Sequence, residues 1–319
     1  MRPIALVTDI DWEGLSLEKD ILESAGFEVV LAEDRSESTL IRLAADASVI
    51  LVCFADVPAS VITAASGATA ILRYGGGVNN IDLVTARASD IPVYNVPDFC
   101  VEEVADHALM LILCLARGLE GQIATTRRGG WAMPGELPLR LSSQTLGLVG
   151  MGRTGSALAR RAQALGMKIL FTMSSRETPP EISATRVADL ETLAAQVDIL
   201  SLHLPMEPEY AGIINALILR KMKSTATLIN VARGGLVDTN DLVDALEQGW
   251  IAQAGLDVTQ PEPLPEDHPL RGFASCVVTP HFAYRSQESI LEVRARVARA
   301  ARDILSGHPP NPSDVSLVG

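Results

Sequence analysis

Three polar residues that can carry acid–base chemistry follow short apolar segments in the second half of the chain: Arg233, Glu262 and His281. A guanidinium is a natural fork for a carboxylate, and an imidazole with a carboxylate partner can exchange a proton near neutral pH. Each residue alone has a simpler reading, as a surface ion pair, a solvated carboxylate or a helix cap. Together they predict an acid–base site with an arginine that binds an anion.

A glycine pattern lies earlier in the chain, between an apolar segment and a helical one. Gly150, Gly152 and Gly155 form G-x-G-x-x-G. Gly150 permits a tight turn, Gly152 lets the backbone approach a pyrophosphate, and Gly155 lets the helix pack closely on the strand. The helix that opens at Arg153 and Thr154 would direct its N–H groups at the diphosphate. Glycines at such a turn are often only structural, but the strand–turn–helix context favours dinucleotide binding.

The next apolar segment has an unusual end for a dinucleotide site. An Asp or Glu that binds the adenosine ribose is expected about 20 residues after the glycine loop, but residues 168–176 contain neither and end in Ser174, Ser175 and Arg176. A carboxylate there would repel a 2′-phosphate, whereas hydroxyl groups and an arginine would accept one. We therefore predict a preference for NADP(H) over NAD(H); the alternative is that Arg176 is only a solvated loop residue.

The elements that must position these residues form two series of alternating strands and helices. The expected strands are residues 4–8, 27–32, 49–54, 70–73 and 92–94, then 145–149, 168–171, 199–202, 227–230, 252–256 and 276–279. The expected helices are residues 17–25, 40–45, 62–66, 101–119, 156–165, 240–248 and 286–305, and residues 127–138 are expected to form a loop. Such alternation predicts parallel sheets covered on both faces.

The long helix at 101–119 separates the two series. We expect one domain of residues 1–98 plus 284–319, because the amphipathic final helix needs an apolar face to cover, and a second domain of residues 99–283. A chain of 319 residues, 48% hydrophobic, suits two domains.

Composition narrows the class of partner. The net charge of −13 and the pI near 4.8 disfavour nucleic acid and anionic membranes. The first residues do not form a signal peptide, and the longest apolar run, 108–116, is about half of what a bilayer span needs. Four dispersed cysteines predict neither a metal site nor a disulfide framework. We expect a cytoplasmic protein with reduced thiols.

With its motifs in view, the chain resembles the D-isomer-specific 2-hydroxyacid dehydrogenase family over nearly its whole length. The segments that carry the resemblance are Arg73–Asp82, Val104–His107, the glycine loop, His203–Pro205, Leu228–Asp238, Pro261–Pro263 and Thr279–His281. The resemblance implies two doubly wound parallel-sheet α/β domains, a flavodoxin-like substrate domain and a Rossmann cofactor domain, with an active-site cleft between them. It also implies a homodimer that transfers a hydride between NAD(P)H and a small 2-oxo acid, such as glyoxylate or hydroxypyruvate.

The resemblance also implies residue roles. Arg233 would bind the substrate's carboxylate and carbonyl oxygen, and His281 would donate a proton to that oxygen. Glu262 would stabilise the imidazolium and keep it an acid near neutral pH. The N–H groups of Gly76 and Gly77 would hold the substrate carboxylate from the other domain. The implied cofactor contacts are Asp257 at the nicotinamide carboxamide, with His203, Leu204, Pro205, Val231, Ala232, Arg233 and His281 lining the rest of the site.

Some positions depart from the family's pattern and leave alternatives open. Asn79 stands where Asp is commoner, and Tyr284 and Arg285 stand where many relatives carry small residues, so we expect either one to shape the pocket. One alternative function is a cofactor-sensing, corepressor-like binding protein of the same fold. Another is phosphoglycerate dehydrogenase; the sequence ends at Gly319, so we expect no C-terminal regulatory domain.

Overall fold

The computed structural model describes residues 2–131, 137–138, 140–174 and 178–318. The chain forms two compact units: unit 1 comprises Met1–Phe99 and Arg285–Gly319, and unit 2 comprises Cys100–Tyr284. Each unit is an α/β layer structure built on its own sheet.

The sheet of unit 1 has the order β13-β5-β4-β3-β1-β2. Its strands are β1 (Ile4–Val7), β2 (Glu28–Leu31), β3 (Val49–Val52), β4 (Ile71–Arg73), β5 (Val93–Asn95) and β13 (Ser316–Leu317). The first five are parallel, and β13 joins β5 antiparallel. The order 2-1-3-4-5 is that of a flavodoxin-like sheet, which confirms the predicted fold class.

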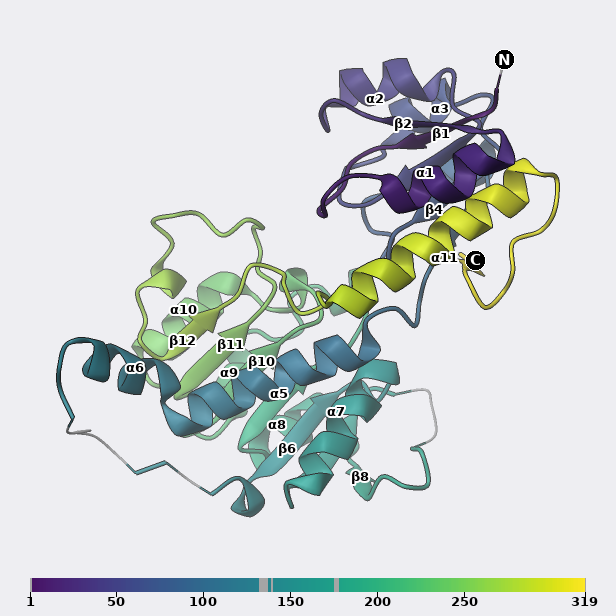
Figure 1. Cartoon of the computed structure of the whole chain (residues 1–319). Helices are drawn as coiled ribbons and strands as arrows, with labels where there is room; N and C mark the ends of the chain where they lie inside the picture. The colour runs from purple at the N-terminus through teal and green to yellow at the C-terminus, as the bar shows by residue number, and fades with distance from the viewer. Residues whose placement is uncertain (1, 132–136, 139, 175–177, 319) are drawn as a thin grey trace. The chain divides into compact units, whose positions relative to one another are not determined.

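Helices cover both faces of this sheet. They are α1 (Ser16–Leu22), α2 (Glu37–Ala44), α3 (Ala59–Ala64), α4 (Leu83–Ala88) and α11 (Gln287–Leu305). The core under α2, α3 and α4 contains Leu40, Val61 and Ile62. The chain's last helix, α11, packs against α1 (Figure 1). Arg294 of α11 reaches the fully buried Glu18 of α1 through two hydrogen bonds of 2.9 and 2.7 Å.

The sheet of unit 2 is parallel, with the order β12-β11-β10-β9-β6-β7-β8. Its strands are β6 (Thr145–Val149), β7 (Lys168–Thr172), β8 (Ala184–Arg186), β9 (Ile199–Leu202), β10 (Thr227–Asn230), β11 (Gln253–Leu256) and β12 (Cys276–Val278). Counted from β6, the order is 3-2-1-4-5-6-7, which contains the Rossmann order and confirms that part of the prediction. The order reverses between β6 and β9, where such sheets bind ligands.

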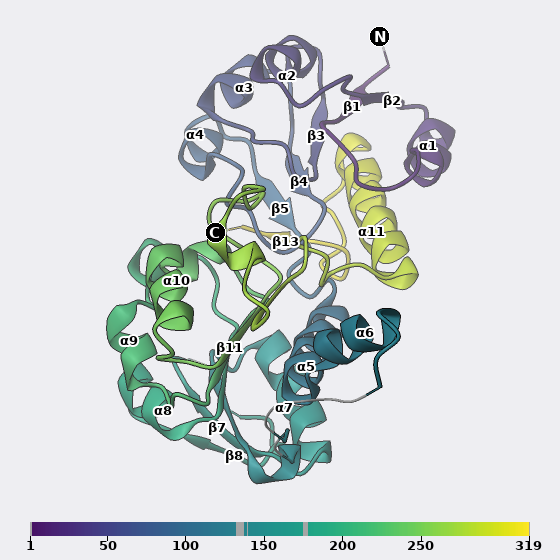
Figure 2. The same cartoon turned by 90° about the vertical axis from the view of Figure 1, so that its left-hand side faces the viewer.

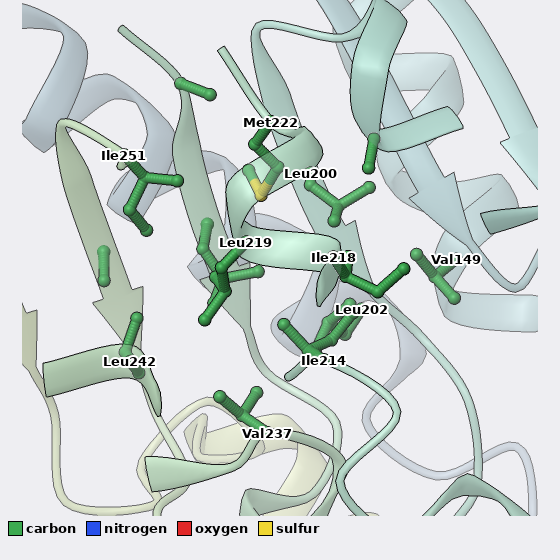
Figure 3. Packing of buried hydrophobic residues seen from close by; sticks show 14 of the residues in the cluster. Val149, Leu200, Leu202, Ile214, Ile218, Leu219, Met222, Val237, Leu242 and Ile251 are labelled. Atoms are coloured by element: carbon green, nitrogen blue, oxygen red, sulfur yellow. The ribbon is translucent and has the colours of Figure 1, made fainter. Parts of the chain in front are cut away.

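Two helical layers bury this sheet. The helices of unit 2 are α5 (Val101–Arg117), α6 (Leu119–Arg127), α7 (Arg153–Ala164), α8 (Leu190–Gln196), α9 (Ala216–Lys221) and α10 (Thr239–Glu247). On one side α8, α9 and α10 lie in sequence along the sheet (Figure 2), and on the other α5 packs against α7 and crosses β10 and β11. The first layer closes over a core that includes Leu200, Leu219 and Leu242 (Figure 3).

Several elements differ from the expectations. The helix expected over 101–119 ends at Arg117, because Gly118 takes a left-handed conformation with φ of 59° and α6 follows in a new direction. The helix α6 extends to Arg127, the residue at which the expected loop of residues 127–138 begins. The short elements α4, α8, α9, β8 and β13 have no counterpart in the expected list. None exceeds seven residues, which is too short for an apolar period to be distinguished.

Candidate active site

The glycine loop joins β6 to α7, at the point where the strand order of unit 2 reverses. Gly150 has a φ of 97°, and a Cβ atom there would lie 2.7 Å from the carbonyl oxygen of His203. A Cβ atom on Gly155 would lie 2.3 Å from the carbonyl oxygen of Gly150. Both positions therefore need glycine, one for the turn and one for close helix packing, as the motif predicts.

The remaining position of the motif faces open space. A Cβ atom on Gly152 would meet no atom within 4 Å. Gly152 is the N-cap of α7, so Arg153 and Thr154 are the first helical residues. The N-terminal end of a helix directs backbone N–H groups and the positive end of its dipole outward, and stabilises an anion bound there. This loop fits a dinucleotide diphosphate.

A cavity of about 950 Å³ opens beside the carboxyl end of β7. Ser174, Leu204 and Pro205, which the sequence singled out, line it together with Arg186 of β8. The predicted residues Ser175 and Arg176 lie outside the described residues. Arg186, which the sequence analysis did not consider, stands 5.1 Å from the ring of Phe171. Because it lies on a strand too short to be predicted, no local signal pointed to it.

His203 follows β9 and lies next to the glycine loop. Its Nε2 atom is 2.9 Å from the hydroxyl oxygen of the fully buried Ser201. Burial lowers the pKa of His203 to about 4. The imidazole is therefore neutral at physiological pH and does not add a positive charge to the cofactor site.

Arg233 lies in a turn that the end of β10 holds in place. The buried Asn230 accepts the N–H of Ala232 at 3.1 Å and donates to the carbonyl oxygen of Arg233 at 2.9 Å. The neighbouring Val231 is buried and Ala232 is half-buried. Asn230 was not identified from the sequence; a polar residue closing an apolar strand was the signal available.

A close backbone contact joins the turn that carries Arg233 to the segment that carries Glu262. A Cβ atom on Gly234 would lie 1.9 Å from the carbonyl oxygen of Thr259. The N–H of Thr259 in turn donates to Oε2 of Glu262 at 3.3 Å. Arg233 and Glu262 are near enough that the guanidinium favours the ionised carboxylate.

The imidazole of His281 is paired with Glu262. Nδ1 of His281 lies 2.6 Å from Oε1 of Glu262, and the two side chains are 31% and 40% exposed. Burial opposes ionisation of Glu262, but the hydrogen bond and charge of His281, the hydrogen bond from Thr259 and the charge of Arg233 together outweigh it, and the pKa of Glu262 falls below its usual value. A histidine whose Nδ1 is held by a carboxylate can exchange a proton with a ligand through Nε2.

His281 has a φ of 53°, a left-handed conformation that is uncommon outside glycine. Its ring stands 6.1 Å from that of Tyr284, edge to face. The structure thus unites Arg233, Glu262 and His281 on one edge of the sheet of unit 2.

Asp257 is enclosed within the protein, with 1% of the residue exposed. Its carboxylate accepts the hydroxyl of Thr279 at 2.5 Å and the N–H groups of Phe282 and Ala283, each at 2.9 Å. His107 of α5 is also within reach, with Nε2 at 3.3 Å. Thr279 and His107 lie in motifs that carry the family resemblance, but no role was expected for either side chain.

Unit 1 carries the other predicted substrate residues. Gly76 is exposed and Gly77 half-buried in the loop after β4. The side chain of Asn95 donates to the carbonyl oxygen of Gly76 at 2.6 Å, and the N–H of Val96 donates to that of Gly75 at 2.9 Å. Arg285, which was expected to shape the pocket, pairs with Asp11 at 3.1 Å.

Among the described residues, no single helix is long and apolar enough to cross a membrane. The helices α5 and α6 together have the length and composition of a membrane span, but they are bent by 62° where they meet. In the same part of the chain, His, Cys, Asp and Glu side chains form no group of three or more that suits a metal ion.

Comparison with known proteins adds independent findings. A family model described as D-isomer specific 2-hydroxyacid dehydrogenase, NAD binding domain, matches residues 109–283. The chain is 37% identical over 318 residues to a glyoxylate reductase of Thermofilum pendens, covering 96% of this chain and 91% of that protein. It is 36% identical over 322 residues to D-3-phosphoglycerate dehydrogenase of Synechocystis sp., covering all of this chain but 57% of that protein, so it spans little more than half of that relative.

A solved structure is similar over almost the whole chain. It is the NADPH-dependent glyoxylate/hydroxypyruvate reductase of Sinorhizobium meliloti in complex with NADP and malonate, with a TM-score of 0.84 and 32% identity. The similarity covers 96% of this chain and 94% of that chain.

Proposed function

Because the chain belongs to the D-isomer-specific 2-hydroxyacid dehydrogenase family, we propose that it reduces a small 2-oxo acid, of the glyoxylate and hydroxypyruvate class, to the D-2-hydroxy acid. The observation that carries the proposal is the pair of His281 and Glu262, joined at 2.6 Å beside Arg233. Relatives named glyoxylate reductase and hydroxypyruvate reductase support the substrate class.

The chain's own residues divide the work. The reduced nicotinamide, when bound, supplies the hydride that reaches the carbonyl carbon. His281 donates the proton that the carbonyl oxygen needs, from Nε2, and the ionised Glu262 stabilises the imidazolium before that transfer. Arg233 binds the carboxylate of the substrate through its guanidinium fork, and the N–H groups of Gly76 and Gly77 are the second anchor in this proposal.

The cofactor would be held by the glycine loop and the cavity beside β7. Gly150, Gly152 and Gly155 with the first turn of α7 fit the diphosphate, while Leu204 and Pro205 line the cavity. The proposed contacts also include Val231, Ala232 and Asp257.

NADPH is the preferred form in this proposal. Residues 168–176 hold no carboxylate to repel a 2′-phosphate, and Ser174 and Arg186 line the cavity. Asp189 and Glu207 also line it, and the carboxylate of Asp189 accepts the N–H of Thr192 at 2.7 Å as the cap of α8. Arg176, though outside the described residues, is the further cation that the sequence offers.

Steady-state kinetics with NADPH and NADH, against a panel of 2-oxo acids, test the proposal. Arg233→Ala and His281→Gln should each lower turnover by about 10²–10⁴-fold, the usual worth of a general acid, while His308→Gln, at an exposed position, should not. Retained turnover in both site variants would refute the assignment. A tenfold preference for NADH would refute the cofactor choice alone.

A second candidate substrate is favoured by one observation in unit 1. The guanidinium groups of Arg35 and Arg73 stand 5.9 and 5.8 Å from the ring of Phe54, and Arg73 directly precedes the loop that carries Gly76. Arg35 is paired with Asp9 at 3.0 Å, so Arg73 is the cation that this reading assigns to an oxo acid with a second anionic group, such as a phosphate, as in D-3-phosphoglycerate dehydrogenase. This reading requires at least tenfold higher kcat/KM for 3-phosphohydroxypyruvate than for hydroxypyruvate, and loss of the difference in Arg73→Leu.

For assembly and location we propose a cytoplasmic homodimer. Met110, Leu113, Leu119 and Ile123 leave apolar side chains exposed on α5 and α6, a surface that a second copy would cover. Light scattering on the purified chain, with Leu113→Glu as the disrupting variant, tests this. The net charge of −13 supports the absence of a nucleic-acid or membrane partner.

A further inference from the structure

Three side chains from separate elements of unit 2 meet behind the acid–base pair. His107 comes from α5, Asp257 follows β11, and Thr279 follows β12. Nε2 of His107 lies 2.9 Å from the hydroxyl oxygen of Thr279, which lies 2.5 Å from Oδ1 of Asp257. The side chains of His107 and Asp257 are 10% and 1% exposed, so water does not compete for these hydrogen bonds.

The hydrogen-bond chain from His107 through Thr279 to Asp257 has one consistent arrangement of donors and acceptors. The hydroxyl of Thr279 donates to the carboxylate of Asp257, which also accepts the N–H groups of Phe282 and Ala283. That hydroxyl has no second proton, so His107 must donate to it through Nε2–H. Burial lowers the pKa of His107 and keeps the imidazole neutral, with the attraction of Asp257 opposing this only in part.

Asp257 in turn holds the turn that carries His281. Its carboxylate accepts the N–H groups of Phe282 and Ala283, and its backbone carbonyl accepts the N–H of His281 at 2.8 Å. Three successive amides are thus tied to one residue. Since His281 occupies a left-handed conformation that costs about 1–3 kcal/mol in a non-glycine residue, the turn depends on these contacts.

We propose that His107 is a positioning residue for the acid–base step: through Thr279 it orients the carboxylate of Asp257, which holds the His281 turn so that the imidazole meets Glu262. The role rests on the proposed function, because it concerns the same imidazole. In this proposal His107 contacts neither the substrate nor the imidazole of His281, and it acts only through the hydrogen bonds of Thr279 and Asp257.

The test compares two variants that remove a hydrogen bond between His107 and Asp257 with one that keeps a donor at position 107. His107→Phe and Thr279→Val remove the link, whereas His107→Gln can still donate from its amide. In the first two, kcat for 2-oxo acid reduction should fall about 10- to 100-fold, part of the usual worth of a general acid, with KM and NADPH affinity within about threefold. His107→Gln should recover most of kcat. Because the two links lie in series, the double variant should be no worse than either single one.

Amide hydrogen exchange supplies a readout that does not depend on turnover. Exchange at Phe282 and Ala283 in the cofactor-free protein should quicken about tenfold or more in His107→Phe and Thr279→Val. It should not change in the control His308→Phe, at an exposed position of unit 1.

The outcomes separate the two proposals. Unchanged exchange at both amides overturns the positioning role, whether or not kcat falls, and so does a kcat within twofold of wild type in both link-breaking variants. If His107→Phe does not fold, Thr279→Val and His107→Gln still decide. If the wild type reduces no 2-oxo acid, the proposed function fails, and exchange alone then decides whether the chain holds the turn.

Discussion

The burial of His203, beside the glycine loop, leads to a quantitative prediction of how the free energy of unfolding depends on pH. His203 is neutral in the folded protein because burial lowers its pKa from 6.5 to about 4. In the unfolded chain the imidazole is free to take up a proton near its ordinary pKa. Between these two values the unfolded state binds more protons, so the free energy of unfolding falls as the pH falls below about 6.5.

The magnitude follows from the two pKa values. The full difference corresponds to about 3 kcal/mol and is reached only below pH 4, since one pKa unit is worth about 1.4 kcal/mol. At pH 5 the folded imidazole is still mostly neutral while the unfolded one is protonated, which gives a loss of about 2 kcal/mol relative to pH 7.5. His203→Gln has no such group and should lose about 2 kcal/mol less over the same interval.

Urea unfolding at pH 7.5 and 5.0 measures this difference. With Trp12 and Trp131 replaced by Phe, the fluorescence of Trp250 reports on unit 2, which contains His203. A slope near 2 kcal/mol per molar urea predicts that the wild-type midpoint drops about 1 M further than that of His203→Gln. Other titrating groups cancel in the comparison.

The control is His308→Gln, which removes an exposed histidine of unit 1 and should behave as the wild type. If the wild type and His203→Gln lose equal stability between the two pH values, within about 0.5 kcal/mol, then burial does not keep His203 neutral and the reasoning fails.

Three further predictions concern the glycine loop, the buried ion pair of Arg294 and Glu18, and the carboxylate of Glu262. Gly155→Ala places a Cβ atom 2.3 Å from the carbonyl oxygen of Gly150, so the dissociation constant for NADPH, measured by fluorescence titration, should rise at least tenfold. Arg294→Met strands the fully buried carboxylate of Glu18 and should cost about 3–5 kcal/mol in thermal or urea unfolding, whereas the double variant with Glu18→Met should recover most of it. Glu262→Gln removes an ionised carboxylate and should lower kcat/KM for the oxo acid about 10- to 100-fold, since it weakens a general acid worth about 10²–10⁴-fold.

Each of these has a result that would contradict it. Unchanged NADPH affinity in Gly155→Ala would mean that the loop relaxes without cost. A double variant as unstable as Arg294→Met would show that the loss comes from packing rather than from an unpaired charge. Full activity in Glu262→Gln, measured across the pH range, would remove that carboxylate from the acid–base step.

Local patterns in the sequence were enough to predict much of the framework. The strands β9 and β10 match their expected ranges at both ends, because a central strand of a parallel sheet is buried on both faces and stands out as a short, mostly apolar run. The glycine loop was also readable, since Gly150 and Gly155 are required by the conformation of their own turn. The order of Arg233, Glu262 and His281 along the chain pointed to an acid–base site before any fold was known.

Only the tertiary structure decided which distant side chains meet. His107 and Thr279 are 172 positions apart in the chain, and Arg294 finds Glu18 across 276, distances over which no apolar period carries information. The burial of Asp257 likewise depends on helices and strands closing around it from several parts of unit 2. Periodicity reports the local backbone and the face it buries, whereas hydrogen-bond partners are chosen by packing, which exists only once the sheets and helices have assembled.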